Sequence, residues 1–224
     1  MSDGRRPILH VIAGPNGAGK TTLYRDRLEK LYPAAEFVNA DELAIKAFGH
    51  PARTAAESAR GQELAEQRRR ELMAERQSLV TESTFSHPSK VDLVREAKAA
   101  GYEVVLYHVN VRSPTLSVAR VADRVDKRGH PVPEDRIRQR YERNQPLIRE
   151  AAKLADRAYV FDNSAVGKPH ELALILKCGE VVRVSENIPT WVRQLYAEEL
   201  MGHISQGRPR AVSRSRRRPS RDEH

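Results

Sequence analysis

Residues 14–21 have the types and the spacing of a phosphate-binding loop. They read Gly-Pro-Asn-Gly-Ala-Gly-Lys-Thr and fit the pattern G-x-x-x-x-G-K-[ST]. Glycines let backbone N–H groups approach an anion, Lys20 can reach the outer phosphates of a nucleotide, and the Thr21 hydroxyl can bind Mg²⁺. The sequence therefore predicts binding of ATP and Mg²⁺, with Thr21 as the metal ligand. The predicted nucleotide-binding residues are Gly14, Pro15, Asn16, Gly17, Ala18, Gly19, Lys20, Thr21 and Thr22.

Acidic residues stand at the ends of three segments that read as strands. Asp41 follows one such segment, and Glu82 and Asp162 end two others. Since ligands of parallel sheets bind beyond the carboxyl ends of the strands, we expect these groups to converge on the phosphate-binding loop. Asp41 could then accept the proton of a substrate hydroxyl, or hold Mg²⁺ through water. Its alternative role is the N-cap of the helix that begins there.

Two further strand-end groups have open roles. Glu82 could hydrogen-bond a polyhydroxyl substrate, or form a salt bridge at the end of the sheet. Residues 162–164 could lie near the nucleotide base, or form a strand-end turn.

A basic segment between residues 112 and 145 has the organisation of a lid. Two predicted helices carry arginines one helical turn apart, so that each pair shares a face, and the breaker at 129–133 joins the helices. Phosphoryl transfer needs cations on the γ-phosphate oxygens, which an arginine-rich lid supplies when it closes. The alternative is a solvated pair of charged helices. The arginines are Arg120, Arg124, Arg128, Arg136 and Arg140.

Strands and helices alternate from the N-terminus to residue 162. This order predicts an α/β protein with a P-loop kinase fold, in which a parallel five-stranded sheet is flanked by helices. A helical lid, a C-terminal β-hairpin over 171–185 and a last helix over 190–204 complete the prediction. We expect one kinase domain at residues 1–205 and a disordered arginine-rich tail at 206–224.

Composition limits the class of protein further. The net charge of the 224 residues is +9, but residues 207–224 hold seven arginines against two carboxylates and so leave only +4 elsewhere. Contact with nucleic acid is therefore expected only through the tail. Cys178 is the single cysteine, and no apolar run has membrane-spanning length. These features favour a cytoplasmic protein that does not contact a membrane.

Taken together, six segments resemble the zeta-toxin family of P-loop kinases over about residues 7–200. The resemblance implies phosphorylation of a nucleotide sugar, typically at the 3′-OH of the N-acetylglucosamine in UDP-N-acetylglucosamine, which starves cell-wall synthesis. It also implies an antitoxin partner that blocks the nucleotide site. The matching segments are 12–22, 38–42, 81–86, 120–125, 129–133 and 161–164.

The resemblance also assigns roles to the matching residues. Asp41 would be the general base, and Glu82 would contact the sugar with Ser83 and Thr84. Lys20 would act on the phosphates of ATP. Arg128 stands where the family has the first glycine of Gly-Gly-His. The lid arginines assigned to phosphate are Arg120, Arg124, Arg128 and Arg140.

Two alternative functions stay open at this stage. One is the same chemistry on another acceptor, such as a nucleoside, an antibiotic or a different sugar. The other is a nucleotide-dependent switch that binds nucleic acid through the arginine-rich tail. Asp41 favours a kinase over a switch, because a switch needs no acceptor pocket. Nothing in the sequence separates the two kinase hypotheses.

Overall fold

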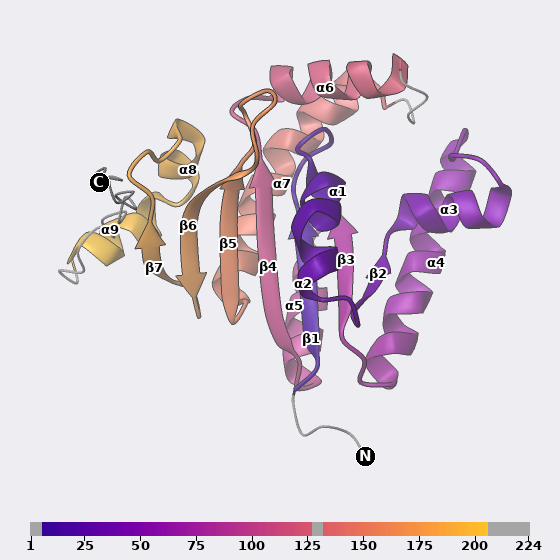
Figure 1. Ribbon diagram of the computed structural model, residues 1–224, viewed down its shortest axis with the longest axis horizontal. Helices are drawn as coiled ribbons and strands as arrows, with labels where there is room; N and C mark the ends of the chain where they lie inside the picture. The colour runs from indigo at the N-terminus through magenta and orange to yellow at the C-terminus, as the bar shows by residue number, and fades with distance from the viewer. Residues whose placement is uncertain (1–5, 127–131, 206–224) are drawn as a thin grey trace, which may run out of the picture.

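A mixed seven-stranded sheet forms the centre of the molecule (Figure 1). The computed structural model describes residues 6–126 and 132–205, with the backbone alone at 124–126. The strands occur in the order β2-β3-β1-β4-β5-β6-β7. Their bounds are β1 Ile8–Ala13, β2 Glu36–Val38, β3 Leu79–Ser83, β4 Glu103–Asn110, β5 Arg157–Asp162, β6 Glu171–Lys177 and β7 Glu180–Val184.

The parallel part of the sheet confirms the predicted alternation of strands and helices. β1 lies between β3 and β4, and all pairs from β2 to β5 are parallel. The predicted C-terminal hairpin exists as β6 and β7, but it extends the sheet instead of standing apart. β6 pairs antiparallel with β5, with Ala158 opposite Leu176. The sheet is therefore mixed and larger than the expected five strands.

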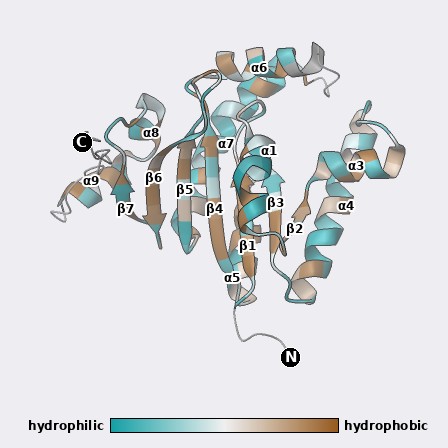
Figure 2. Ribbon diagram, viewed as in Figure 1, coloured by the Kyte–Doolittle hydropathy of each residue, from teal (hydrophilic) through white to brown (hydrophobic). Residues whose placement is uncertain are grey.

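Helices cover the sheet on both faces. α4, α5 and α7 bury side chains such as Leu72, Val94 and Ile148 against one face, and the helix after β1 buries Leu23 and Leu28 against the other. Figure 2 shows hydrophobic residues over much of β1, β4 and β6, whereas hydrophobic and hydrophilic residues are mixed along the helices. The helices are α1 Lys20–Leu23, η1 Tyr24–Leu28, α2 Glu29–Leu31, α3 Ala40–Phe48, α4 Ala55–Ala74, α5 Ser89–Ala99, α6 Pro114–Asp126, α7 Glu134–Leu154, α8 Thr190–Leu195 and α9 Ala197–Ser205.

The structure adds two local details to the helices and corrects one prediction. The segment after the phosphate-binding loop contains a π-helical turn, η1, between α1 and α2. Pro88 occupies the N-cap position of α5. The last helix is divided at Tyr196, whose fully buried hydroxyl lies 2.9 Å from Nδ1 of His108. Burial of this side chain fixes where α8 ends.

α3 and α4 form a helical hairpin beside the sheet (Figure 1). Gly61 allows the close approach, because a Cβ there would lie 2.6 Å from the carbonyl oxygen of Ala40. Thr54 and Glu57 form a capping box that starts α4, an arrangement that satisfies two otherwise unpaired backbone donors. The hairpin thereby places the N-termini of both helices at the same end of the sheet as the phosphate-binding loop.

Some sequence predictions lie outside the described residues. They concern Arg128, most of the breaker at 129–133 and the tail at 206–224. The proposed domain boundary at residue 205 stays a prediction for the same reason. Within the described part of the chain, no helix is long and apolar enough to cross a membrane.

Candidate active site

The phosphate-binding loop connects β1 to α1, as predicted. Two of its glycines have no space for a side chain. A Cβ on Gly14 would lie 2.0 Å from the carbonyl oxygen of Val109, and one on Gly17 would lie 2.7 Å from that of Ser117. Gly17 also has a φ of 73°, which favours glycine. The close packing of this loop therefore explains why these residues are glycines.

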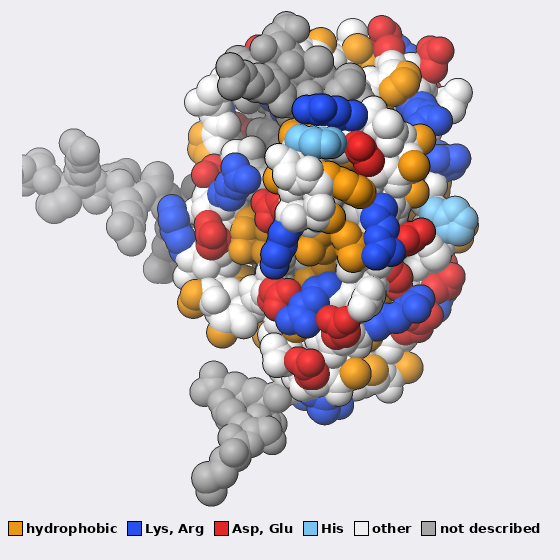
Figure 3. Space-filling model, turned by 90° about the vertical axis from the view of Figure 1, so that its right-hand side faces the viewer, with side chains coloured by type: hydrophobic (Ala, Val, Ile, Leu, Met, Phe, Trp, Pro, Cys, Tyr) orange, Lys and Arg blue, Asp and Glu red, His pale blue; other side chains and the backbone are white. Residues whose placement is uncertain are grey.

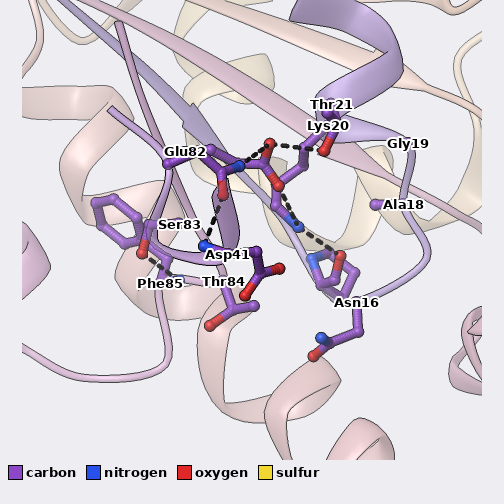
Figure 4. A network of polar contacts seen from close by, with 12 residues as sticks. Asn16, Ala18, Gly19, Lys20, Thr21, Asp41, Glu82, Ser83, Thr84 and Phe85 are labelled. Atoms are coloured by element: carbon purple, nitrogen blue, oxygen red, sulfur yellow. Dashed lines mark hydrogen bonds and ion pairs between the residues drawn. The ribbon is translucent and has the colours of Figure 1, made fainter. Parts of the chain in front are cut away.

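Lys20 and Thr21 meet Glu82 at the start of α1 (Figure 4). Lys20 is 7% exposed, and its Nζ donates to the carbonyl oxygen of Pro15 at 3.1 Å and lies 3.7 Å from Oε1 of Glu82. The Thr21 hydroxyl donates to Oε2 of Glu82 at 2.8 Å. Since its proton points at the carboxylate, the oxygen of Thr21 keeps its lone pairs for a metal ion.

The Glu82 carboxylate contacts three side chains: Lys20, Thr21 and Asn39. Its Oε2 also accepts from the side-chain amide of Asn39 at 3.1 Å. Part of the salt-bridge alternative considered from the sequence is thus present, with Lys20 as the partner. The contact of Glu82 with a sugar stays a prediction. Hard cations such as Mg²⁺ prefer oxygen ligands and are commonly held by one carboxylate beside phosphates, so the oxygens of Thr21 and Glu82 fit this ion.

Asp41 is not the N-cap of its helix. Asn39 takes that position, and its side-chain oxygen accepts from the backbone N–H groups of Asp41 at 2.8 Å and Glu42 at 3.2 Å. The Asp41 carboxylate is therefore not needed for capping. It is exposed and lies among Glu82, Thr84 and Asn16 (Figure 4). A carboxylate in this place can accept a proton from a hydroxyl bound in front of the loop.

A cleft of about 580 Å³ opens in front of Asp41, a size typical of small-molecule sites. The predicted substrate residues Ser83 and Thr84 line it together with Lys20 and Glu82. The walls come from the phosphate-binding loop, the α3–α4 hairpin, the β3–α5 loop and the start of α7. The remaining lining side chains are mostly polar, which suits a hydroxyl-rich ligand.

The lid arginines divide into two groups. Arg140 lines the cleft; burial chiefly lowers its pKa, the positive charges of Arg136 and Arg143 lower it further, and the negative charge of Asp41 opposes them. Arg120 lies on the other side of the loop, beside Gly17. Burial lowers its pKa and the charge of Asp162 raises it.

The structure describes less of the remaining lid. Arg136 lines the cleft together with Arg140. The side chain of Arg124 and all of Arg128 lie outside the described residues. The Ser117 hydroxyl of α6 donates to the carbonyl oxygen of Asn16 at 2.9 Å, which fastens the start of the lid to the phosphate-binding loop.

The turn after β5 supports the loop from behind. Asn163 donates to the carbonyl oxygen of Ala18 at 2.8 Å. Nε2 of His170 lies 3.0 Å from the carbonyl oxygen of Gly19. Asp162 accepts from Trp191 at 2.7 Å and does not line the cleft in front of Asp41. The turn hypothesis for 162–164 therefore has direct structural support, and residues 163 and 170 hold the loop.

Sequence reasoning missed several residues of this site. Asn39 stands two residues before Asp41, and a helix N-cap pattern would have found it. Arg53 and Lys90 line the cleft, but no local motif marks them. His170 was not singled out because its partner, the Gly19 carbonyl, is distant in sequence.

Comparisons with known proteins identify the family of this chain and structures with a similar fold. The model of the zeta toxin family matches residues 1–168. A solved chain of the AvrRxo1-ORF1:AvrRxo1-ORF2 complex with sulphate ions is 18% identical at a TM-score of 0.61, with 88% of this chain and 64% of that chain covered. This chain thus spans less than two thirds of the length of that relative. No curated protein sequence matches.

A second solved structure covers nearly the whole of both chains. It belongs to the PezAT chromosomal toxin–antitoxin system of Streptococcus pneumoniae, with 18% identity, a TM-score of 0.57, and 92% of this chain and 89% of that chain covered. A third, the AvrRxo1-ORF1:-ORF2 complex with ATP, is 19% identical at a TM-score of 0.58, with 88% and 64% covered.

The parallel sheet with β1 in its centre, the loop before α1 and the helical lid define a P-loop protein with a kinase-like fold. The family match extends from the phosphate-binding loop past the turn after β5. The chain belongs to the zeta toxin family.

Proposed function

We propose that this chain is an ATP-dependent kinase of the zeta-toxin type, and that its acceptor is a nucleotide sugar. The 3′-OH of UDP-N-acetylglucosamine is the acceptor that family membership favours most. One observation carries the proposal: the Asp41 carboxylate lines the cleft beside the phosphate-binding loop while Asn39 caps its helix. If Asp41 only capped its helix, its carboxylate would not be available as a base in the cleft.

The groups around the cleft account for the steps of phosphoryl transfer. Asp41 accepts the proton of the acceptor hydroxyl as the hydroxyl oxygen bonds to the γ-phosphorus and the bond to ADP breaks. Lys20 and the loop N–H groups hold the β- and γ-phosphates. Arg140 and Arg136 face the cleft and stabilise the charge on the transferred group. Thr21 and Glu82 would hold Mg²⁺, which would neutralise phosphate charge when bound.

The proposal extends to the organisation of the chain. Residues 1–205 form the kinase domain, residues 112–145 its lid, and residues 206–224 a tail outside the catalytic machinery. The similar Streptococcus pneumoniae structure belongs to a toxin–antitoxin system, which supports a small antitoxin as partner. Figure 3 views the side of α3 and α4, where acidic and basic side chains are interspersed. This face thus lacks the single-sign surface typical of a nucleic-acid interface.

An acceptor screen tests the proposed reaction. The purified protein with labelled ATP and Mg²⁺ is expected to transfer phosphate to UDP-N-acetylglucosamine, and Asp41→Asn is expected to abolish this transfer within the detection limit of the screen. Nucleosides, aminoglycoside antibiotics and unrelated sugars serve as competing acceptors. If phosphate is transferred only to one of these competing acceptors, the proposed nucleotide sugar is wrong but the proposed kinase activity is supported. Hydrolysis of ATP with no acceptor at all would favour the switch.

A titration of Mg²⁺ tests the role of Glu82. Glu82→Gln is expected to raise the Mg²⁺ concentration for half-maximal activity by about 10–100-fold or more, because even the loss of a group that only orients a metal ligand has an effect of this size. Glu63→Gln is the matched control, because Glu63 lies on the exposed face of α4 and pairs only with Arg60 among the described residues. An unchanged Mg²⁺ requirement in Glu82→Gln would mean that Glu82 does not bind Mg²⁺. Contact with the acceptor would then be its only proposed role.

A further inference from the structure

The cleft carries more positive than negative charge once the pairs within it are assigned. Of the two carboxylates that line it among the residues the structure describes, Glu82 is already bonded to Lys20, Thr21 and Asn39. Asp41 is the other. Four cationic side chains of the lining form no ion pair with any residue that the structure describes. They are Arg53, Lys90, Arg136 and Arg140.

Lys90 differs from the other three because a buried cation lies close to it. It is half-buried in the first turn of α5, and burial followed by the charge of Arg69 lowers its pKa, while Glu66 opposes them. Arg69 is 4% exposed and bonds Glu66 and the hydroxyl of Thr81. One carboxylate, Glu66, is shared by three cations, Arg69, Arg70 and Lys90, and an anion in the cleft would stabilise Lys90 and its neighbour Arg69.

This cationic group lies apart from the phosphate-binding loop. Arg69 bonds Thr81, whereas the next residue, Glu82, bonds Thr21 of the loop. Successive side chains of a strand point to opposite faces of the sheet, so Lys90 belongs to the α4–α5 side and Lys20 to the α1 side. The lining of the cleft is also rich in hydroxyls and amides: Thr54, Ser58, Gln62, Thr84 and Ser86.

We infer that Lys90, supported by Arg69 and Glu66, binds a phosphate group of the acceptor and thereby selects a phosphorylated acceptor over a neutral one. The inference rests on the proposed kinase function. An acceptor bound in this way reaches from its phosphate at Lys90 to its hydroxyl at Asp41, with its polar body along the hydroxyl-rich lining. A nucleotide sugar satisfies these requirements, and an uncharged sugar, a nucleoside or a cationic antibiotic does not. Lys90 is a specificity residue and takes no part in the proton transfer.

Steady-state kinetics with a charged and an uncharged acceptor test the inference. At saturating ATP, Lys90→Met is expected to raise KM for UDP-N-acetylglucosamine by about 10–100-fold, the effect of losing a charge-assisted hydrogen bond. Its kcat and its KM for free N-acetylglucosamine are expected to change little. Lys90→Arg should restore most of the affinity. Lys177→Met, on the exposed end of β6, is the matched control and should behave as wild type.

A binding measurement separates this inference from the proposed function. The loop is first saturated with a non-hydrolysable ATP analogue, and UDP is then titrated into wild type, Lys90→Met and Lys90→Gln by calorimetry. Weaker UDP binding in both variants, without any sugar being phosphorylated, would support the inference and reject the proposed acceptor. Phosphorylation of UDP-N-acetylglucosamine with unchanged KM in the variants would overturn the inference and keep the kinase. If the wild type neither binds UDP nor phosphorylates UDP-N-acetylglucosamine, both the inference and the proposed function are overturned.

Discussion

Asp41→Asn is expected to lower kcat for the acceptor by about 10²-fold or more, the contribution of a general base. ATP affinity and the melting temperature should stay close to wild type. The structure sharpens this expectation, because Asn39 caps α3 and the Asp41 side chain makes no capping bond. Loss of the charge therefore removes the base without removing a support of the helix. Phosphorylation kinetics, an ATP titration and a melting curve provide the three measurements.

Glu42→Gln is the matched control for this substitution. Glu42 is the next residue of α3, it is also exposed, and its backbone N–H also donates to Asn39. The same loss of one negative charge there should leave kcat nearly unchanged. If Asp41→Asn retains turnover close to that of Glu42→Gln, Asp41 is not the base, and Glu82 becomes the next residue to test.

Lys20→Ala is expected to reduce phosphoryl transfer by about 10²–10³-fold or more, the effect of removing one oriented donor from developing charge. Binding of ATP should weaken as well, since Lys20 contacts the outer phosphates in the proposed complex. The fold should survive, because Glu82 keeps its bonds to Thr21 and Asn39. The measurements are turnover with labelled ATP, ATP affinity and the melting temperature.

Lys30→Ala is the control for Lys20→Ala. Lys30 lies exposed on α2, in the helical segment that continues from the loop, and does not line the cleft. Its loss changes the net charge equally and should leave turnover intact. Full turnover by a folded Lys20→Ala protein would contradict the assignment of residues 14–21 to the phosphates of ATP.

The sequence alone determined the loop, the alternation of elements and the family. Each depends on short-range information. The loop pattern lies within eight residues, and strands and helices follow from local periodicity and breakers such as Gly49 and Gly101. The position of Asp41 after β2 also followed, because the carboxyl ends of parallel strands share one edge of a sheet.

Only the tertiary structure decided how the polar groups at that edge pair. Glu82 bonds Thr21 and Asn39 across long stretches of sequence, and which oxygen meets which donor depends on how α1 and α3 are rotated against the sheet. For the same reason the lid arginines separated into Arg120 beside the loop and Arg140 in the cleft. The neighbourhood of Lys90 and Arg69 could not be read from sequence, because the two residues lie on different helices, α5 and α4. Burial then turns an ordinary lysine into a group that an anion stabilises.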